Sequence, residues 1–205
     1  MSEFDLNHLT QTYFDVLKEI GNIGAGNATT ALAQLLNCKV DMQVPQVKLL
    51  DFAEVGDMIG GAEQIMAGIY SGVEGDIQGS IMFLLERGSA RNLVEKLMGV
   101  ESEEGTAFSE MEESALREIG NIITGSYLNA LSELTNFKIY PTVPSLCVDM
   151  AAAILSVPAI EFGAVGDKIL LIQTQFSDEM KLDGYFIMVP EMESYDKIMK
   201  SLGIA

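Results

Sequence analysis

Two copies of a Glu-x-x-Asn pair carry the side chains in this chain that could do chemistry. The first is Glu19 with Asn22, and the second is Glu118 with Asn121, 99 positions later. A side-chain amide can hold a water molecule in line with a phosphoryl group, provided that the phosphoryl group and its metal ion come from another molecule. The glutamate could then dock on a lysine of that partner. Because phosphoryl transfer depends on orientation more than on covalent help, this pair could promote phosphate hydrolysis.

Other kinds of site fit the residues less well. The chain has one histidine, His8, which excludes Ser-His and Cys-His nucleophiles and sites built from several imidazoles. Asp15 could join Glu19 as the carboxylate pair of a glycosidase, but the second copy has Ser114 instead and no aromatic platform surrounds it. One carboxylate and one amide per segment also make a poor cage for a cation. We therefore expect no metal site of the chain's own.

The Glu-x-x-Asn pairs belong to an internal repeat. Asp15–Pro45 and Ser114–Pro144 align without a gap, with 14 identities in 31 positions. This similarity predicts a duplicated unit of about 100 residues, with halves at 1–105 and 106–205 that form one domain. Glu101–Gly105 is expected to be a solvated acidic connector.

The repeated segments are expected to be long helices that position the pairs. They run from about Thr12 to Leu36 and from Glu110 to Thr135. A capping box, Ser109-x-x-Glu112, precedes the second helix. Asn37 and Asn136 are expected to be left-handed caps at the two C-terminal ends.

One face of these helices carries the repeated polar residues. With Asp15 at zero, Glu19 falls near 40°, Asn22 near −20° and Gly26 near 20°, opposite an apolar stripe at roughly 140° to 220°. A solvated face without a function would have drifted after duplication, yet the second copy keeps the Glu, Asn and Gly. Glycine in a helix is unfavourable by about 1 kcal/mol. We expect either close packing or a bare patch for a partner at Gly26 and Gly125.

The rest of each half predicts strands and a short helix. Strands are expected over Gln64–Ser71, Asp76–Leu85, Asp167–Phe176 and Leu182–Val189, with turns at Gly72–Gly75 and Ser177–Glu179. Short helices are expected over Ala90–Met98 and Met192–Leu202, each followed by a glycine. The order within each half is therefore a long helix, three strands and a short helix. It favours an α/β fold of the α+β type with an antiparallel sheet.

The composition limits the partners and the compartment. Asp and Glu number 30 against 12 Lys and Arg, a net charge of −18, which argues against nucleic acid and against anionic membrane surfaces. No signal peptide or membrane span is visible, so we expect a cytoplasmic protein. Cys38 and Cys147 are interpreted as small buried hydrophobic residues. Because the chain is already duplicated, we expect a monomer.

The spacing of the repeated residues resembles that of a known family. Asp15-x3-Glu19-x2-Asn22-x22-Pro45, and the matching residues Ser114, Glu118, Asn121 and Pro144, both fit the D/S-x3-E-x2-N-x22-P signature of the CheC/CheX/FliY phosphatases, which act on the phosphorylated chemotaxis regulator CheY. Two complete motifs resemble CheC most. The family implies a pseudo-twofold fold with two long, parallel-facing motif helices on a continuous antiparallel sheet.

The resemblance also implies the roles of these residues. Glu19 and Glu118 would contact the regulator's active-site lysine, while Asn22 and Asn121 would orient the hydrolytic water toward the aspartyl phosphate. Magnesium would sit in the regulator, so the chain would need no cofactor of its own. The Asp15, Pro45, Ser114 and Pro144 side chains would play structural or interface roles.

The resemblance leaves a second partner and two alternatives to consider. The segment Leu146–Leu155, with Asp149 and Met150 at its centre, is similar to the segment with which CheC proteins bind the receptor deamidase CheD. A strand followed by a short buried helix is the plainer interpretation of that segment. A non-catalytic adaptor that binds phosphorylated CheY and regulates CheD is one alternative function, and a component of the flagellar rotor is another.

Overall fold

The computed structural model describes residues 11–42, 46–99, 105–162, 168–177 and 182–203. Both halves run through the same succession of a long helix, two outer strands, a short helix, two central strands and a last helix. The elements are α1 (Gln11–Leu36), β1 (Asp41–Met42), β2 (Gln46–Asp51), α2 (Phe52–Met58), β3 (Ile65–Gly75), β4 (Gly79–Glu86), α3 (Arg87–Met98), α4 (Glu110–Thr135), β5 (Ile139–Pro141), β6 (Ser145–Met150), α5 (Ala151–Phe162), β7 (Lys168–Ser177), β8 (Leu182–Pro190) and α6 (Met192–Ser201).

The sheet is continuous and interleaves the two halves. Its eight strands follow the order β1-β7-β8-β4-β3-β5, with β2 also on β7 and β6 also on β3, and every paired neighbour is antiparallel. The central pair is β4 and β8, where Phe83 faces Phe186. Each half therefore lends its two outer strands to the edge of the other half's central strands. The expected antiparallel sheet of an α+β fold is confirmed.

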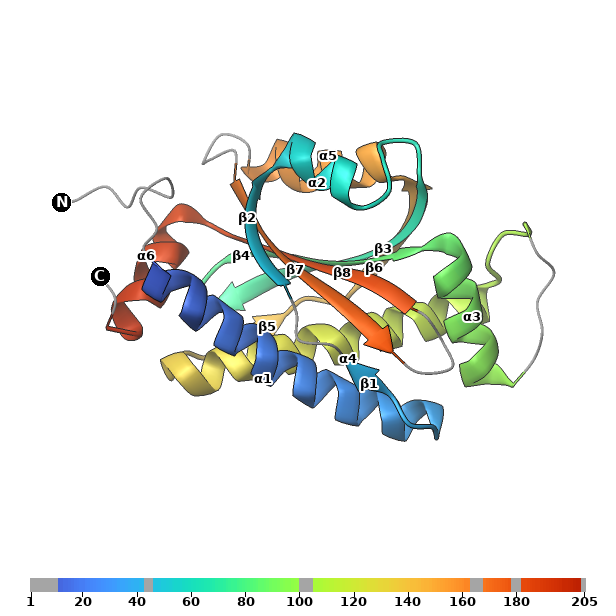
Figure 1. Ribbon diagram of the computed structural model, residues 1–205, viewed down its shortest axis with the longest axis horizontal. Helices are drawn as coiled ribbons and strands as arrows, with labels where there is room; N and C mark the ends of the chain where they lie inside the picture. Colours follow the sequence, from blue (N-terminus) through green and yellow to red (C-terminus); the bar gives the residue numbers. More distant parts are fainter. Residues whose placement is uncertain (1–10, 43–45, 100–104, 163–167, 178–181, 204–205) are drawn as a thin grey trace.

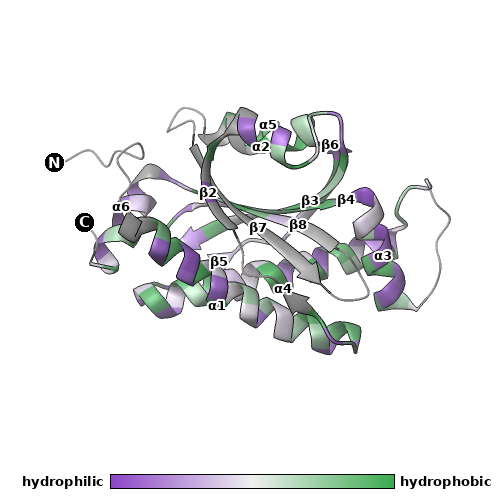
Figure 2. Cartoon of the chain, in the orientation of Figure 1, coloured by the Kyte–Doolittle hydropathy of each residue, from purple (hydrophilic) through white to green (hydrophobic). Residues whose placement is uncertain are grey.

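The sheet separates two layers of helices (Figure 1). Alternate residues along β3 and β4 serve two cores: Ile69 and Phe83 join the α1, α3, α4 and α6 side, while Met66 and Leu84 join the α2 and α5 side. The strands β3 and β4 are hydrophobic over most of their length, whereas α1 and α4 alternate hydrophobic and hydrophilic residues (Figure 2). That is the pattern of a sheet buried on both faces between amphipathic helices.

The long helices α1 and α4 lie side by side on one face of the sheet and run in opposite directions (Figure 1). A methyl group at Gly24 would lie 2.5 Å from Cδ1 of Tyr127, so glycine allows the helices to approach closely there. A methyl group at Gly120 would lie 2.4 Å from Cγ2 of Ile69 on β3, so this glycine brings α4 down onto the sheet. The expectation of parallel-facing helices is therefore wrong in direction, because a twofold relation between halves reverses one helix.

Both ends of α4 form as predicted. Ser109 and Glu112 make a complete capping box, and Asn136 takes a left-handed conformation at φ 58°. Asn37, after α1, is also left-handed at φ 48°. The short helix α3 ends at Gly99 with φ 67°, as its glycine predicts.

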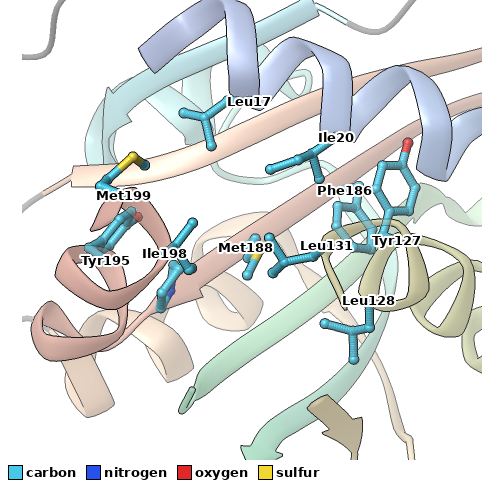
Figure 3. A pocket seen from close by; sticks show the side chains of 11 residues that line it. Leu17, Ile20, Tyr127, Leu128, Leu131, Phe186, Met188, Tyr195, Ile198 and Met199 are labelled. Carbon is cyan, nitrogen blue, oxygen red and sulfur yellow. The ribbon is translucent and has the colours of Figure 1, made fainter. Parts of the chain in front are cut away.

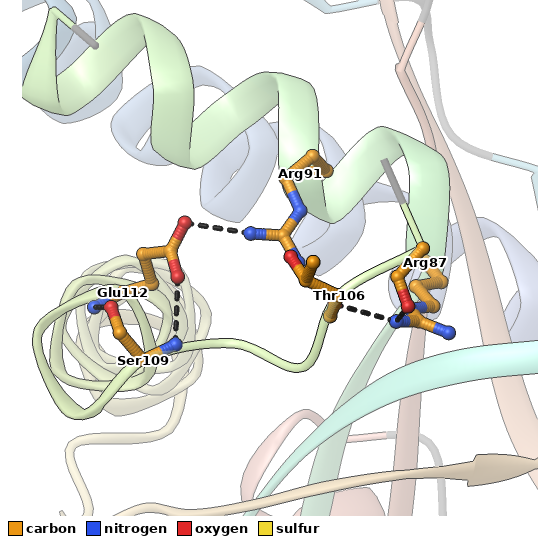
Figure 4. Close-up of polar contacts among 6 residues, drawn as sticks. Arg87, Arg91, Thr106, Ser109 and Glu112 are labelled. Carbon is orange, nitrogen blue, oxygen red and sulfur yellow. Dashed lines mark hydrogen bonds and ion pairs between the residues drawn. The ribbon is translucent and has the colours of Figure 1, made fainter. Parts of the chain in front are cut away.

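A buried ion pair ties α3 to the start of α4 (Figure 4). Nη1 of Arg91 lies 2.6 Å from Oε1 of Glu112, and both side chains are about nine-tenths buried. Nη2 of Arg91 donates to the carbonyl oxygen of Thr106 at 2.7 Å, and its guanidinium lies 4.1 Å from the ring centre of Phe108. Glu112 also accepts from the backbone N–H of Ser109. The second motif helix is thereby fixed at its N-terminal end.

Two local features differ from what the sequence predicted. The helix α2 was not expected, because its seven residues include Gly56 and Asp57, which are poor helix formers. The turn expected at Gly72–Gly75 belongs to β3, which pairs with β4 and β5 through this stretch. Gly75 has φ 118°, and a Cβ there would lie 2.1 Å from the Lys138 carbonyl oxygen, so the glycine permits a close backbone approach instead of a turn. The connector 101–104 and the turn residues 178–179 lie outside the described residues.

Candidate functional site

The side chains of the repeated motif reach solvent on the two long helices. Glu19, Glu118 and Asn121 are exposed and Asn22 is half-buried. Within the described part of the chain, no hydrogen bond or ion pair engages any of these four. They are therefore available to a partner. Asp15 and Ser114 are also exposed, one turn earlier on the same faces.

Each motif face is turned away from the neighbouring long helix. On α1, Gly24 faces the neighbouring helix at Tyr127, and it lies half a helical turn away from the Asp15–Gly26 stripe. Because the halves correspond residue by residue and the helices run antiparallel, the α4 stripe likewise faces away from α1. The chain thus presents two separate sites, one on each outer flank of the helix pair.

The glycines within these faces have two different roles. A Cβ at Gly26 or Gly125 would meet nothing within 4 Å, so neither glycine is needed for packing inside the chain. They leave the helix backbone bare one turn beyond each motif asparagine. Of the two explanations considered for these glycines, the bare patch fits, whereas close packing explains Gly24 and Gly120 instead.

A bulge in the outer strand carries Pro144. Pro141 pairs with Val73 and Ser145 pairs with Tyr70, so three residues, 142–144, face two on β3. The same step occurs in the other half, where Met42 pairs with Phe176 and Gln46 with Gln173. Bulges occur at sheet edges, where they redirect side chains. Pro45 lies outside the described residues.

The register places this bulge beside the second motif. Gly120 rests on Ile69, and β3 and α4 run in the same direction (Figure 1). The bulge faces Ser71 and Gly72, two to three residues further along β3, a distance of about 7–10 Å. At a rise of about 1.5 Å per helical residue, this distance corresponds to residues 125–127 of α4, one turn beyond Asn121. The 22 residues between Asn121 and Pro144 complete α4 and return along it through β5.

An apolar layer holds the motif helices on the sheet (Figure 3). Leu17 and Ile20 of α1 face Leu131 of α4 across a space that β8 and α6 also line. The cavity at its centre is about 20 Å³, room for about one water molecule, and its walls are apolar. It fits a rigid support for the helices and not a ligand site.

The residues Asp149 and Met150 lie at the end of β6, a strand that neighbours the motif helix α4. This strand pairs with β3 on one side and is exposed almost throughout. Val148 and Met150 are among its exposed apolar side chains, and Ile65 of β3 pairs with Met150. The plainer interpretation of this segment, a strand followed by a short helix, is confirmed by β6 and α5. An accessible apolar strand with one carboxylate is a surface that a partner could cover.

The burial predicted for the cysteines is wrong. Cys147 is exposed on β6 and Cys38 is half-buried after α1. An edge strand leaves one side of the chain open to solvent, so apolar character alone did not decide burial at Cys147. Among the residues that the structure describes, no three His, Cys, Asp or Glu side chains gather as a metal site would require, and no helix is long and apolar enough to span a membrane.

Sequence reasoning passed over one exposed residue beside the site, Val143. It occupies the bulge immediately before Pro144 and is 90% exposed. The signal was present in the repeat, because Val44-Pro45 matches Val143-Pro144. Valine in a strand is usually taken as a core residue, so its exposure became visible only with the bulge.

Comparisons with known proteins identify the class of protein that this fold and motif define. The profile of the CheC-like family matches residues 15–49 and 111–148, which contain both copies of the motif. The chain is 39% identical over 202 residues, 96% of its length, to the CheY-P phosphatase CheC of Bacillus subtilis, of which the match covers 97%. The chain belongs to the CheC-like family.

Solved structures share the fold. FliY of Thermotoga maritima superposes with a TM-score of 0.73 at 22% identity, over 96% of this chain and 98% of that one. CheX of Borrelia burgdorferi, solved in a complex with CheY, BeF3 and magnesium, gives a TM-score of 0.55 at 17% identity, over 83% of this chain and 97% of that one. At these identities, the likeness concerns the fold alone.

Proposed function

We propose that this protein is a chemotaxis phosphatase that hydrolyses the aspartyl phosphate of the response regulator CheY. The observation that carries the proposal is the duplicated Glu/Asn stripe, exposed and unengaged on both outer flanks of the helix pair. The extensive similarity to a CheY-P phosphatase of the same length supports it. The reaction would take place in the cytoplasm, with the chain acting as a monomer.

Each motif would complete an active site that the regulator only partly supplies. The amide of Asn22 or Asn121 would hold a water molecule in line with the phosphorus. The carboxylate of Glu19 or Glu118 would bind the regulator's lysine and so set the position of the asparagine. Magnesium, the phosphoryl group and their charge balance would belong to the regulator. Asp15 and Ser114 would sit at the rim of the interface, and Pro144 would lie near it in the bulge of the outer strand.

The acidity of the chain fits a site in which the regulator supplies the magnesium and the phosphoryl group. A net charge of −18 disfavours the binding of small free phosphates. A phosphate that arrives already neutralised by lysine and magnesium carries no such penalty. The bare backbone at Gly26 and Gly125 would let the regulator come close to each asparagine.

The exposed surface of β6 supports a second partner, the receptor deamidase CheD. Asp149, Met150 and Val148 are accessible together on a strand that lies on the far side of β3 from the sheet centre. The strand β6 also neighbours the motif helix α4.

A non-catalytic adaptor is the second candidate, and one experiment separates the two. The lifetime of the phosphate on CheY is followed with and without saturating amounts of the protein. A phosphatase shortens the lifetime, and the Asn22→Ala/Asn121→Ala variant loses this effect while it still binds. An adaptor forms the saturated complex and leaves the phosphate lifetime unchanged.

A further inference from the structure

Val143 stands out from the surface although nothing in the fold requires a hydrophobic residue there. It is 90% exposed, the largest value among the exposed large hydrophobic residues that the structure describes. Four of the other residues of this kind are half as exposed or less: Ile65, Val148, Met150 and Val157. An apolar side chain held in water gains nothing for folding, because its burial is what stabilises the native state.

The fold holds this valine in a fixed position. Thr142 makes two hydrogen bonds with Gly72. Its N–H donates to the Gly72 carbonyl, and its Oγ1 accepts from the Gly72 N–H at 2.8 Å. Pro141 and Pro144 bracket the segment and restrict its backbone. A side chain presented in this way loses little conformational entropy when a partner covers it.

The position of Val143 brings it within reach of an interface centred on Asn121. The bulge lies one turn beyond Asn121, beside residues 125–127 of α4. A typical protein interface covers about 800 Å² of each partner, a disc of roughly 16 Å radius. A domain whose phosphate reaches Asn121 can therefore extend as far as Val143.

We propose that Val143 is an apolar docking contact for the receiver domain of the phosphorylated regulator. This inference rests on the proposed function and adds to it a residue that recognises the partner without touching the phosphate. The repeat supports it, since valine precedes the motif proline in both halves. Both halves also show the same register step. On a surface of net negative charge, an apolar contact adds affinity without repelling an acidic partner.

The test uses the second site alone, in an Asn22→Ala parent. Val143→Ala is expected to raise KM for the phosphorylated regulator by roughly three- to tenfold, as the loss of two buried methyl groups predicts, and to leave kcat unchanged. Val143→Thr keeps the shape and replaces one of the two methyl groups with a hydroxyl, so it should also raise KM. The matched control is Val157→Ala on α5, an exposed valine on the opposite layer, which should change neither constant.

The outcomes separate this inference from the function on which it rests. An active parent whose KM is unaffected by both Val143 substitutions would overturn the docking contact and leave the phosphatase intact. A fall in kcat at constant KM would also overturn it, because the valine would then act by positioning Asn121. If the wild-type chain did not shorten the phosphate lifetime at all, the proposed function would itself fail.

Discussion

The glycines of α4 allow stability and activity to be separated within one helix. Gly120 and Gly125 are five residues apart, and each would gain a methyl group on replacement by alanine. A Cβ at Gly125 meets nothing within 4 Å, whereas a Cβ at Gly120 lies 2.4 Å from Cγ2 and 2.9 Å from Cβ of Ile69. Alanine is favoured over glycine in a helix by about 1 kcal/mol.

These distances set the expected changes in the free energy of unfolding. Gly125→Ala should stabilise the protein by about 1 kcal/mol, which raises Tm by about 2–4 °C in a chain of this size. Gly120→Ala should be destabilised by up to about 2 kcal/mol. Non-bonded carbons prefer about 3.5–4.0 Å, and overpacking of about 1–3 kcal/mol outweighs the gain in helix propensity.

The activity of the same variants should follow the opposite order. Gly125→Ala places a methyl group on the bare patch one turn beyond Asn121, so the regulator could not approach as closely. Because a displacement of about 1 Å can lower a positioned reaction on the order of 10²-fold, we expect at least a tenfold loss in kcat/KM at the second site. The rate per folded molecule of Gly120→Ala should change much less, because its methyl group faces the sheet.

Thermal or urea unfolding and the decay of regulator phosphate, both in an Asn22→Ala parent, measure the two properties. Gly125→Ala should be more stable and less active than its parent. A stabilised variant with full activity would refute the role of the bare patch. A destabilised Gly125→Ala would refute the assignment of Gly125 to open surface.

Three further predictions concern the buried ion pair, the buried tyrosine and the number of sites. Arg91→Met should lower the free energy of unfolding by about 3–5 kcal/mol, since it leaves Glu112 buried without its cation, and adding Glu112→Leu should restore part of the loss in urea unfolding. Burial raises the pKa of Tyr195, so the native state keeps its proton while the unfolded chain ionises above the ordinary value of 10.0. Stability should therefore fall as pH rises past that value, by up to about 1.4 kcal/mol per pH unit, and Tyr195→Phe should remove this part of the alkaline loss in unfolding titrations. Titration calorimetry with a regulator activated by beryllofluoride should give two regulators per chain, because the motifs face opposite flanks, whereas a ratio of one would contradict that geometry.

The motif helices could be predicted because their signals are local or repeated. The capping box at Ser109, the left-handed Asn37 and Asn136, and the polar stripe opposite the apolar one all depend on residues close in sequence. The duplication added an internal comparison that separated the Glu/Asn pairs from an ordinary solvated face. It could not reveal the exchange of outer strands between the halves.

The features that sequence reasoning missed depend on contacts between distant segments. Gly75 resembled a turn residue because its partner, the Lys138 carbonyl, lies 63 positions away in the other half. The bulge at Val143 exists only as a mismatch in register between two strands and has no composition of its own. The direction of α4 relative to α1 follows from the twofold relation, which a repeat in sequence allows but does not specify.

The central claim is that Asn22 and Asn121 orient the attacking water, and phosphate decay on the regulator tests it most directly. The regulator is phosphorylated in magnesium, and its decay is followed with the wild-type chain, each single asparagine-to-alanine variant and the double variant. The double variant should lose on the order of 10²-fold or more of the acceleration while it still binds the regulator, and each single variant should keep the activity of its intact site. If the double variant accelerated phosphate decay as much as the wild type does, Asn22 and Asn121 would not be the residues that orient the water.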